Sequence, residues 1–275
     1  MLLSNKLLLT LTVAAADVFS QTFSKCNPLK TRGCPPNAAF GKKLASCNLT
    51  RDVCGVFTPT GGTFGSRGAV FKIDKESDAP TIETPKFIFF GKLDVVMQAA
   101  PGRGIITSAV LQSDDLDEID WEFIGGDNAR VQTNYFSKGN VSTYDRGQFH
   151  AVSNPTGSSH KYTLEWTSAK VVWSIDDKPV RTLLAADCRD DTSSGFPQTP
   201  MQIKLGTWVA GKRGSAQGTI DWAGGYVDWK QKPFVAYYRD VVITDYAGGD
   251  APGKDAKRYV YGDNTGRRQS IKVQQ

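Results

Sequence analysis

Apolar residues occur along this chain in short runs separated by turn residues, and the 3.6-residue period of an amphipathic helix is hardly seen. Runs of this kind, bounded by Gly, Pro, Asn and Asp, predict β-strands. Many such strands between residues 61 and 250 predict an all-β fold: a single-domain antiparallel β-sandwich of two stacked sheets, arranged as a jelly roll. The expected strands cover 93–98, 105–111, 129–136, 201–209 and 234–243, with a hairpin from 162–166 and 171–175.

One predicted strand is unusual because acidic and apolar residues alternate in it. Its sequence from Glu118 to Glu122 is Glu-Ile-Asp-Trp-Glu. Side chains alternate between the two faces of a strand, so Glu118, Asp120 and Glu122 share one face, and Ile119 and Trp121 fill the other. Like charges on one face destabilise a sheet unless something is bound there or one group holds a proton. The run therefore indicates catalysis.

Two carboxyl groups are the minimal equipment of a glycosidase, and retention of configuration requires them about 5 to 5.5 Å apart. The Cα atoms of Glu118 and Glu122, four residues apart in a strand, are separated by about 13 Å. Two extended glutamates that lean toward each other can close most of this gap, whereas aspartates would not reach. Asp120, between them, can hydrogen-bond the ionised glutamate and keep the two pKa values apart. A solvated acidic strand or a calcium site is the alternative that these residue types leave open.

Length and composition add little to this picture. The chain has 275 residues, 40% of them hydrophobic and 11% aromatic. An all-β sandwich of this length commonly remains one domain, and the aromatic content suits a carbohydrate cleft or a β core. The net charge of +5 is modest, and only residues 251–275 form a polar basic tail, which we expect to be a solvated end. We expect no contact with nucleic acid, because no basic-aromatic platform accompanies the charge.

Residues 1–20 have the pattern of a secretory signal peptide, with a positive charge before an apolar stretch, and we place the cleavage site after Ser20. The apolar stretch is too short for a transmembrane helix, and no other stretch approaches that length. The sequence thus predicts a secreted protein. In such a protein, the sequons at Asn48 and Asn140 predict glycosylated surface loops, with unused sequons as the alternative.

The cysteine pattern agrees with secretion, since an oxidising compartment makes disulfides the expected state. Cys26 with Cys34 is the first expected pair, and Cys47 with Cys54 the second. The other two connectivities of these four cysteines remain open, and Cys188 is either free or a competing partner. No Cys-x-x-Cys pair or nearby histidine supports a zinc site, and no metal or other cofactor is expected.

The residues around the acidic run resemble a known family. Residues 108–127, followed by 132–136, are similar to the active-site strand of glycoside hydrolase family 16 and, within that family, to the fungal Crh chitin-glucan transglycosylases. The cysteine-bearing segment 26–36 resembles theirs too. The resemblance extends over about residues 26 to 250 and implies a concanavalin A-like sandwich.

This resemblance implies a catalytic domain at 61–250, with the disulfide-containing segment 21–60 packed on it. It makes Glu118 the nucleophile, Asp120 the supporting acid and Glu122 the general acid/base. The expected donor is β-1,4-linked chitin, and the expected acceptor is β-glucan or a chitin oligosaccharide.

The substrate-binding surface should lie on the face that carries the carboxyl groups. Lys204 and Trp208 share one face of the strand 201–209, and Trp208 could stack on a sugar ring. Trp166 and Trp173, by contrast, are expected to fill the core. The full set of expected substrate-binding residues is Gln112, Glu122, Asn134, Tyr135, Lys204, Trp208, Thr219 and Trp222.

Two other functions remain open from the sequence. One is a hydrolytic chitinase or β-glucanase with the same carboxyl groups, and the other is a non-catalytic polysaccharide-binding protein of the wall whose carboxylates hold a cation. Either way, we expect a monomer located in the cell wall or at the outer face of the plasma membrane. No anchor signal follows Gln275, so attachment through a GPI anchor would require a longer precursor.

Overall fold

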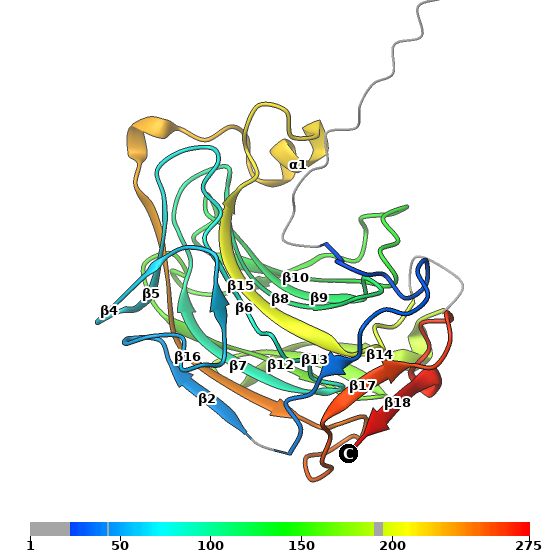
Figure 1. The fold of residues 1–275 in the computed structure, drawn as a ribbon. Helices are drawn as coiled ribbons and strands as arrows, with labels where there is room; N and C mark the ends of the chain where they lie inside the picture. Colours follow the sequence, from blue (N-terminus) through cyan, green and yellow to red (C-terminus); the bar gives the residue numbers. More distant parts are fainter. Residues whose placement is uncertain (1–22, 43, 190–194) are drawn as a thin grey trace, which may run out of the picture.

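Two antiparallel β-sheets lie face to face in this computed structural model, which describes residues 23–42, 44–189 and 195–275 (Figure 1). The predicted all-β jelly-roll sandwich is confirmed. The first sheet has seven strands in the order β11-β10-β9-β8-β15-β6-β3. In chain order these are β3 (Thr58–Pro59), β6 (Thr81–Glu83), β8 (Ile105–Ser113), β9 (Glu118–Ile124), β10 (Arg130–Phe136), β11 (Gln148–Ala151) and β15 (Met201–Val209).

The second sheet has the order β14-β13-β12-β7-β16-β5-β4, and β2 also pairs with β16. Its strands are β2 (Ala45–Asn48), β4 (Thr63–Gly65), β5 (Gly68–Ile73), β7 (Gly91–Gln98), β12 (His160–Trp166), β13 (Lys170–Ile175), β14 (Lys178–Leu184) and β16 (Phe234–Asp245). Helical structure in the described residues is confined to α1 (Gln217–Trp222), η1 (Ala185–Asp187), η2 (Trp229–Gln231) and η3 (Arg268–Ser270).

The hydrophobic core lies between the two sheets and fixes the direction of every side chain on β9. Ile119 and Trp121 are at most 1% exposed in this core. The ring of Trp121 meets Tyr162 of β12 edge-on, with centroids 5.3 Å apart, and Trp173 of β13 donates a hydrogen bond of 3.1 Å to the backbone carbonyl of Asp120. Each buried side chain of this size stabilises the fold by about 1.5 to 3 kcal/mol. The acidic residues of β9 therefore point the opposite way, to the concave outer face of the sheet.

Core filling is also the role of two tryptophans that the sequence analysis assigned to the interior. Trp166 and Trp173 are both 0% exposed. Trp166 meets Phe90 edge-on, with ring centroids 4.7 Å apart, and its indole N–H donates to the backbone carbonyl of Pro197 at 3.0 Å. Their placement in the core is confirmed.

The C-terminal residues form a third small sheet, so the expectation of a solvated end over 251–275 was wrong. β17 (Arg258–Tyr261) lies between β1 (Asn37–Ala38) and β18 (Ile271–Gln274). Tyr259 is fully buried and donates its hydroxyl to the Asp245 carboxylate. The basic residues are exposed between these apolar ones, and a reading based on charge alone overlooked the alternation.

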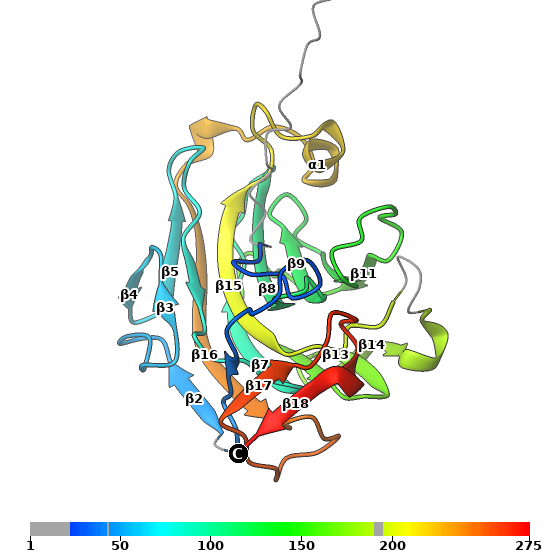
Figure 2. The ribbon, with the colours of Figure 1, turned by 45° about the vertical axis from the view of Figure 1, so that its right-hand side comes forward.

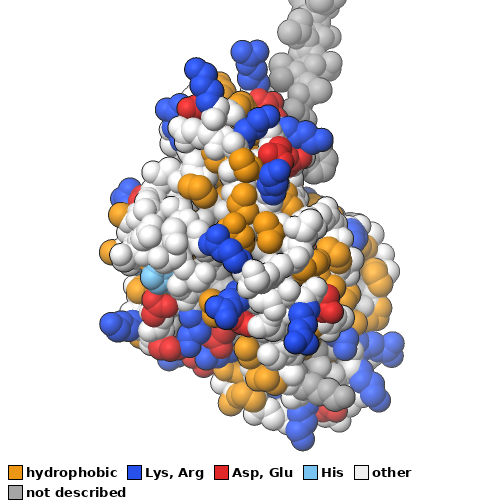
Figure 3. Space-filling view, turned by 90° about the vertical axis from the view of Figure 1, so that its left-hand side faces the viewer, with side chains coloured by type: hydrophobic (Ala, Val, Ile, Leu, Met, Phe, Trp, Pro, Cys, Tyr) orange, Lys and Arg blue, Asp and Glu red, His pale blue; other side chains and the backbone are white. Residues whose placement is uncertain are grey.

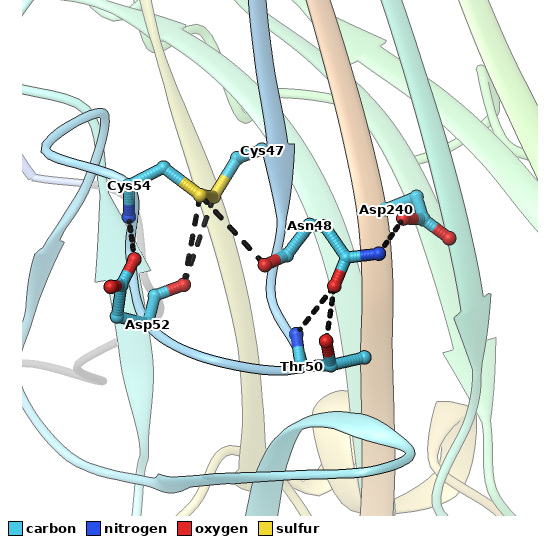
Figure 4. Close-up of a disulfide and its surroundings, with 6 residues drawn as sticks. All are labelled: Cys47, Asn48, Thr50, Asp52, Cys54 and Asp240. Atoms are coloured by element: carbon cyan, nitrogen blue, oxygen red, sulfur yellow. Dashed lines mark hydrogen bonds between the residues drawn. A yellow bond between two sulfur atoms is a disulfide. The ribbon is translucent and has the colours of Figure 1, made fainter.

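Two disulfides tie down the N-terminal part of the chain: Cys26–Cys34 and Cys47–Cys54. They are the two pairs expected from the sequence, and Cys188 belongs to neither. The second disulfide closes the loop after β2 (Figure 4). Because β2 joins one sheet and β3 the other, this part of the chain contributes strands to both sheets of the sandwich.

The surface carries mixed charge. On the side of β4 and β5, Figure 3 shows lysines and arginines spread among acidic and hydrophobic side chains. The positive net charge is therefore not gathered into one patch on this face. None of the helices in the described part of the chain has the length and hydropathy needed to cross a bilayer.

Candidate active site

β9 holds three carboxyl groups in a row on the concave face of the seven-stranded sheet. The strand lies between β8 and β10 and pairs with both in antiparallel register. Gln112 of β8 stands opposite Glu118, and Asn134 of β10 stands opposite Asp120. Glu118 and Glu122 are partly exposed, whereas Asp120 between them is 1% exposed. The row therefore has two accessible acids on either side of a buried one.

The surroundings of Asp120 disfavour its ionised form. Neither of its buried carboxyl oxygens has an amide, hydroxyl or ammonium donor among the described residues. Burial raises the pKa of Asp120 well above its ordinary value, and the charges of Glu118 and Glu122 raise it further. A protonated Asp120 can donate a hydrogen bond to the Glu118 carboxylate. This bond favours the ionised form and lowers the pKa of Glu118.

Glu118 has more groups that favour its ionised form than Glu122 has. Burial raises its pKa to about 7, and Asp120, the charge of Lys204 and Gln112 oppose that rise. The Gln112 amide donates to Glu118 Oε2 at 3.2 Å, and Lys204 Nζ donates to Gln112 Oε1 at 2.6 Å. A relay from a buried ammonium group thus ends on the Glu118 carboxylate.

Glu122 retains its proton to higher pH. Burial and the charge of Glu118 raise its pKa to about 8, and a hydrogen bond from Asn134 opposes them. Asn134 Oδ1 accepts from the backbone N–H of Tyr135 at 3.0 Å, so its amide nitrogen is left to donate to Glu122. Between these two pKa values an ionised Glu118 and a protonated Glu122 are favoured together, and such a pair can supply a nucleophile and an acid.

Two tryptophans lie beside the carboxyl groups. The rings of Trp208 on β15 and Trp222 on α1 stack with centroids 6.4 Å apart, and both are partly exposed. Trp222 donates its indole N–H to Gln132 Oε1 at 2.9 Å, and Gln132 stands opposite Glu122 in the sheet. Thr219, also partly exposed, lies on the same helix, which covers one end of the concave face (Figures 1 and 2).

Tyr135 is turned away from this face, against the expectation that it binds substrate. It stands opposite Ile119 in register and is 6% exposed, and the Arg181 guanidinium lies 5.4 Å from its ring centroid. The physical reason is the alternation of side chains along β10, because neighbouring residues of a strand point to opposite faces. Since Asn134 points to the carboxyl groups, Tyr135 points to the core side of the sheet. We therefore leave Tyr135 out of the site.

Gln132 is the residue that the sequence analysis missed. It is 8% exposed, and its side chain links Trp222 to the strand that pairs with β9. The available signal was its spacing from Asn134, because residues two apart in a strand lie on the same face. In the described part of the chain, no group of three or more His, Cys, Asp or Glu side chains could hold a metal ion.

Comparison with known proteins places the chain in a family. The model of glycosyl hydrolases family 16 matches residues 53–224. Crh-like protein 5 of Aspergillus fumigatus is 46% identical over 260 residues, which are 92% of this chain and 62% of that protein. Crh-like protein 4 of Botryotinia fuckeliana is 44% identical over 265 residues, which are 96% of this chain and 68% of that protein.

A solved structure agrees with these relatives. The structure of a Crh5 transglycosylase in complex with NAG is 45% identical, has a TM-score of 0.83, and covers 90% of this chain and 100% of that one. This chain spans only 62% of the length of the Aspergillus relative. The family model and the relatives together show that the chain belongs to glycosyl hydrolase family 16 and, within it, to the Crh-like proteins.

Proposed function

We propose that this chain is a retaining transglycosylase that cleaves β-1,4-linked chitin and transfers the released chain to β-glucan or to a chitin oligosaccharide. The observation that carries the proposal is the row of two accessible glutamates on either side of the buried Asp120, on one face of β9. The raised pKa values, about 7 for Glu118 and about 8 for Glu122, agree with it. The raised pKa of Asp120 favours its protonated form, and a hydrogen bond with Asp120 lowers the pKa of Glu118.

In the first step, the Glu118 carboxylate attacks the anomeric carbon of the donor. A carbon–oxygen bond to Glu118 forms as the glycosidic bond breaks, and Glu122 transfers its proton to the departing oxygen. Asp120, as a hydrogen-bond donor to Glu118, positions the attacking oxygen and stabilises the charge on it until the bond forms. The product is a covalent glycosyl-enzyme.

The second step uses the change of charge on Glu118. As an ester, Glu118 is neutral, and the repulsion that raises the pKa of Glu122 disappears. The pKa of Glu122 falls, so Glu122 remains deprotonated after it has given up its proton, until an acceptor hydroxyl arrives. It takes the proton of that hydroxyl as the acceptor oxygen attacks the anomeric carbon, and Glu118 leaves as carboxylate. Two displacements at one carbon retain its configuration.

The polar and aromatic residues around the carboxyl groups suit a carbohydrate chain. We propose that Trp208 and Trp222 stack on sugar rings, because the face of an aromatic ring accepts the apolar face of a pyranose. Amide, hydroxyl and ammonium groups would bond the hydroxyl and acetamide groups of the sugars. The proposed binding residues beside Glu122 are Gln112, Gln132, Asn134, Lys204, Trp208, Thr219 and Trp222.

The relatives supply the substrate class. The Crh5 transglycosylase whose structure is 45% identical to this chain was solved with NAG, and NAG is the repeating unit of chitin. We extend this to the present chain as a proposal, together with secretion, action in the cell wall or at the outer face of the plasma membrane, possible GPI attachment in a longer precursor, and a monomeric state.

We also propose N-glycans on Asn48 and Asn140. Asn48 is exposed, and its Nδ2 donates to the Asp240 carboxylate at 2.8 Å (Figure 4). A glycosylated Asn48 keeps one N–H on that nitrogen, so the bond to Asp240 is compatible with the modification. Endoglycosidase treatment of the protein from its natural host should reduce its mass, and Asn48→Gln should remove part of that shift.

The decisive assay for transfer uses a chitin oligosaccharide donor and a fluorescent β-glucan or chitin oligosaccharide acceptor. We expect a fluorescent product longer than the acceptor that forms with the wild type and not with Glu118→Gln. Hydrolysis products alone would instead identify a chitinase. Oligosaccharide binding without any turnover by the wild type would identify a non-catalytic wall-binding protein.

A further inference from the structure

The first described residues of the chain lie against the active-site sheet, and the reaction above makes no use of them. Figures 1 and 2 show this segment beginning over the concave face of the seven-stranded sheet. The ring of Phe23 lies over Lys204 Nζ, 4.6 Å from the ring centroid, and Lys25 Nζ is 3.9 Å from Glu83 Oε1. Glu83 of β6 stands opposite Lys204 of β15. The segment therefore contacts two neighbouring strands on the carboxylate side of the sheet.

Phe23 is a large apolar residue that the fold leaves about half exposed. Its side chain is 51% exposed, although burial would favour an apolar ring. The ring contacts Lys204, which is 3% exposed, and leaves the rest of its surface to solvent. Cys26 begins a disulfide-closed loop three residues later, and Pro28 is buried, so the segment is anchored close to the ring.

Phe23 also lies at the outer end of the relay that reaches the candidate nucleophile. Lys204 donates to Gln112, and Gln112 donates to Glu118. Lys204 is on β15, two strands from β9, which corresponds to about 10 Å across the sheet. An oligosaccharide bound at the carboxyl groups and extending across β8 and β15 would thus come to the free surface of this ring.

We infer that Phe23 is a sugar-stacking residue and forms the wall of the oligosaccharide cleft on the β15–β6 side. Phe23, three residues after the predicted cleavage site, then belongs to the binding site. This inference rests on the proposed function, because it takes a chain of β-1,4-linked N-acetylglucosamine as the ligand. The opposite arrangement, in which the ring obstructs the cleft, is an outcome of the test.

The test measures binding of chitin hexasaccharide by calorimetry in the Glu118→Gln background, where turnover does not consume the ligand. We expect Phe23→Ala to weaken binding about tenfold, a factor that corresponds to about 1.4 kcal/mol. Phe23→Trp should retain most of the affinity, because it keeps an aromatic face. Leu44→Ala is the matched control, since it removes another exposed apolar side chain, 62% exposed, next to β2 of the other sheet.

Unchanged or tighter binding by Phe23→Ala would overturn the inference, as would equal losses in Phe23→Ala and Leu44→Ala. Absence of hexasaccharide binding to Glu118→Gln itself would overturn it too. Thermal unfolding of each variant verifies that the fold is intact. A wild type that makes no transfer product, combined with weaker binding in Phe23→Ala, would refute the proposed reaction and leave the inference standing.

Discussion

Two pairs of acids with raised pKa values lie within eight positions of each other, and they differ in access and in partners. Asp115 and Asp117, in the turn before β9, are both 0% exposed, whereas Glu118 and Glu122 on β9 are partly exposed. Burial raises the pKa of Asp117 and Glu118 to about 7 and that of Glu122 to about 8, and it also raises the pKa of Asp115.

The hydrogen-bond donors separate the two pairs more clearly than the pKa values do. The Asp117 carboxylate accepts from the backbone N–H of Gln198 at 2.8 Å and from the Thr199 hydroxyl at 2.9 Å. Glu118, in contrast, is bound by Gln112 on one side and meets the Asp120 carboxyl on the other. A raised pKa alone therefore does not identify a catalytic acid. An enclosed pair with fixed donors stabilises the fold, and an accessible pair with few donors is available for chemistry.

The largest expected effect comes from Glu118→Gln. Since this variant removes the proposed nucleophile, transfer and hydrolysis should both fall by about 10⁴-fold or more. The rate is measured with the fluorescent acceptor, and Asp117→Asn serves as the matched control that removes a neighbouring acid from the enclosed pair. Substantial activity in Glu118→Gln would contradict the catalytic role that separates the accessible pair of acids from the enclosed pair.

Glu122→Ala should have a smaller effect that depends on the leaving group. A general acid contributes about 10² to 10⁴-fold when the departing oxygen needs a proton. We expect a loss in that range on chitin oligosaccharide and a far smaller loss on an aryl chitobioside, because a phenolate leaves without protonation. Rates are measured as bond cleavage in the first turnover, before slow breakdown of the glycosyl-enzyme limits the reaction. Equal losses on both substrates in this measurement would contradict the role of Glu122 as acid.

Asp117→Asn should affect stability instead of catalysis. The asparagine keeps the shape of the side chain but replaces one accepting oxygen with an N–H₂ group. This group cannot accept the hydrogen bonds that Gln198 and Thr199 donate to Asp117. Loss of such a buried hydrogen bond costs about 1 to 3 kcal/mol, and urea unfolding should show a decrease of that size. The transfer rate per folded molecule should remain near that of the wild type. A loss of activity without a loss of stability would place Asp117 in the reaction.

A further predicted effect is a pH dependence of stability. The pKa of Glu122 is raised from 4.5 to about 8, so between these values the folded protein holds a proton that the unfolded chain releases. The stability that this group contributes is complete below 4.5 and is lost as the pH rises toward 8. Glu122→Gln does not titrate, so its Tm should improve relative to that of the wild type as the pH rises. If the Tm of the variant minus that of the wild type stays constant or decreases as the pH rises, the raised pKa is contradicted.

The sequence predicted the sandwich and the common face of the β9 carboxyl groups because both follow from the two-residue period of a strand. The same period, applied to β10, would have separated Asn134 from Tyr135 and drawn attention to Gln132. Contacts between distant segments lay beyond local patterns. The burial of Lys204 beneath Phe23 depends on how the N-terminal segment returns to β15, and no local pattern of residues specifies that path.

The most direct test of the account is to trap the covalent intermediate and locate it. In Glu122→Gln, an aryl chitobioside should still form the glycosyl-enzyme, because its leaving group needs no acid, and breakdown should be slow without a base. Mass spectrometry of the intact protein and its peptides should find one added chitobiosyl group, bound to Glu118. No adduct, or an adduct on a residue other than Glu118, would contradict the assignment.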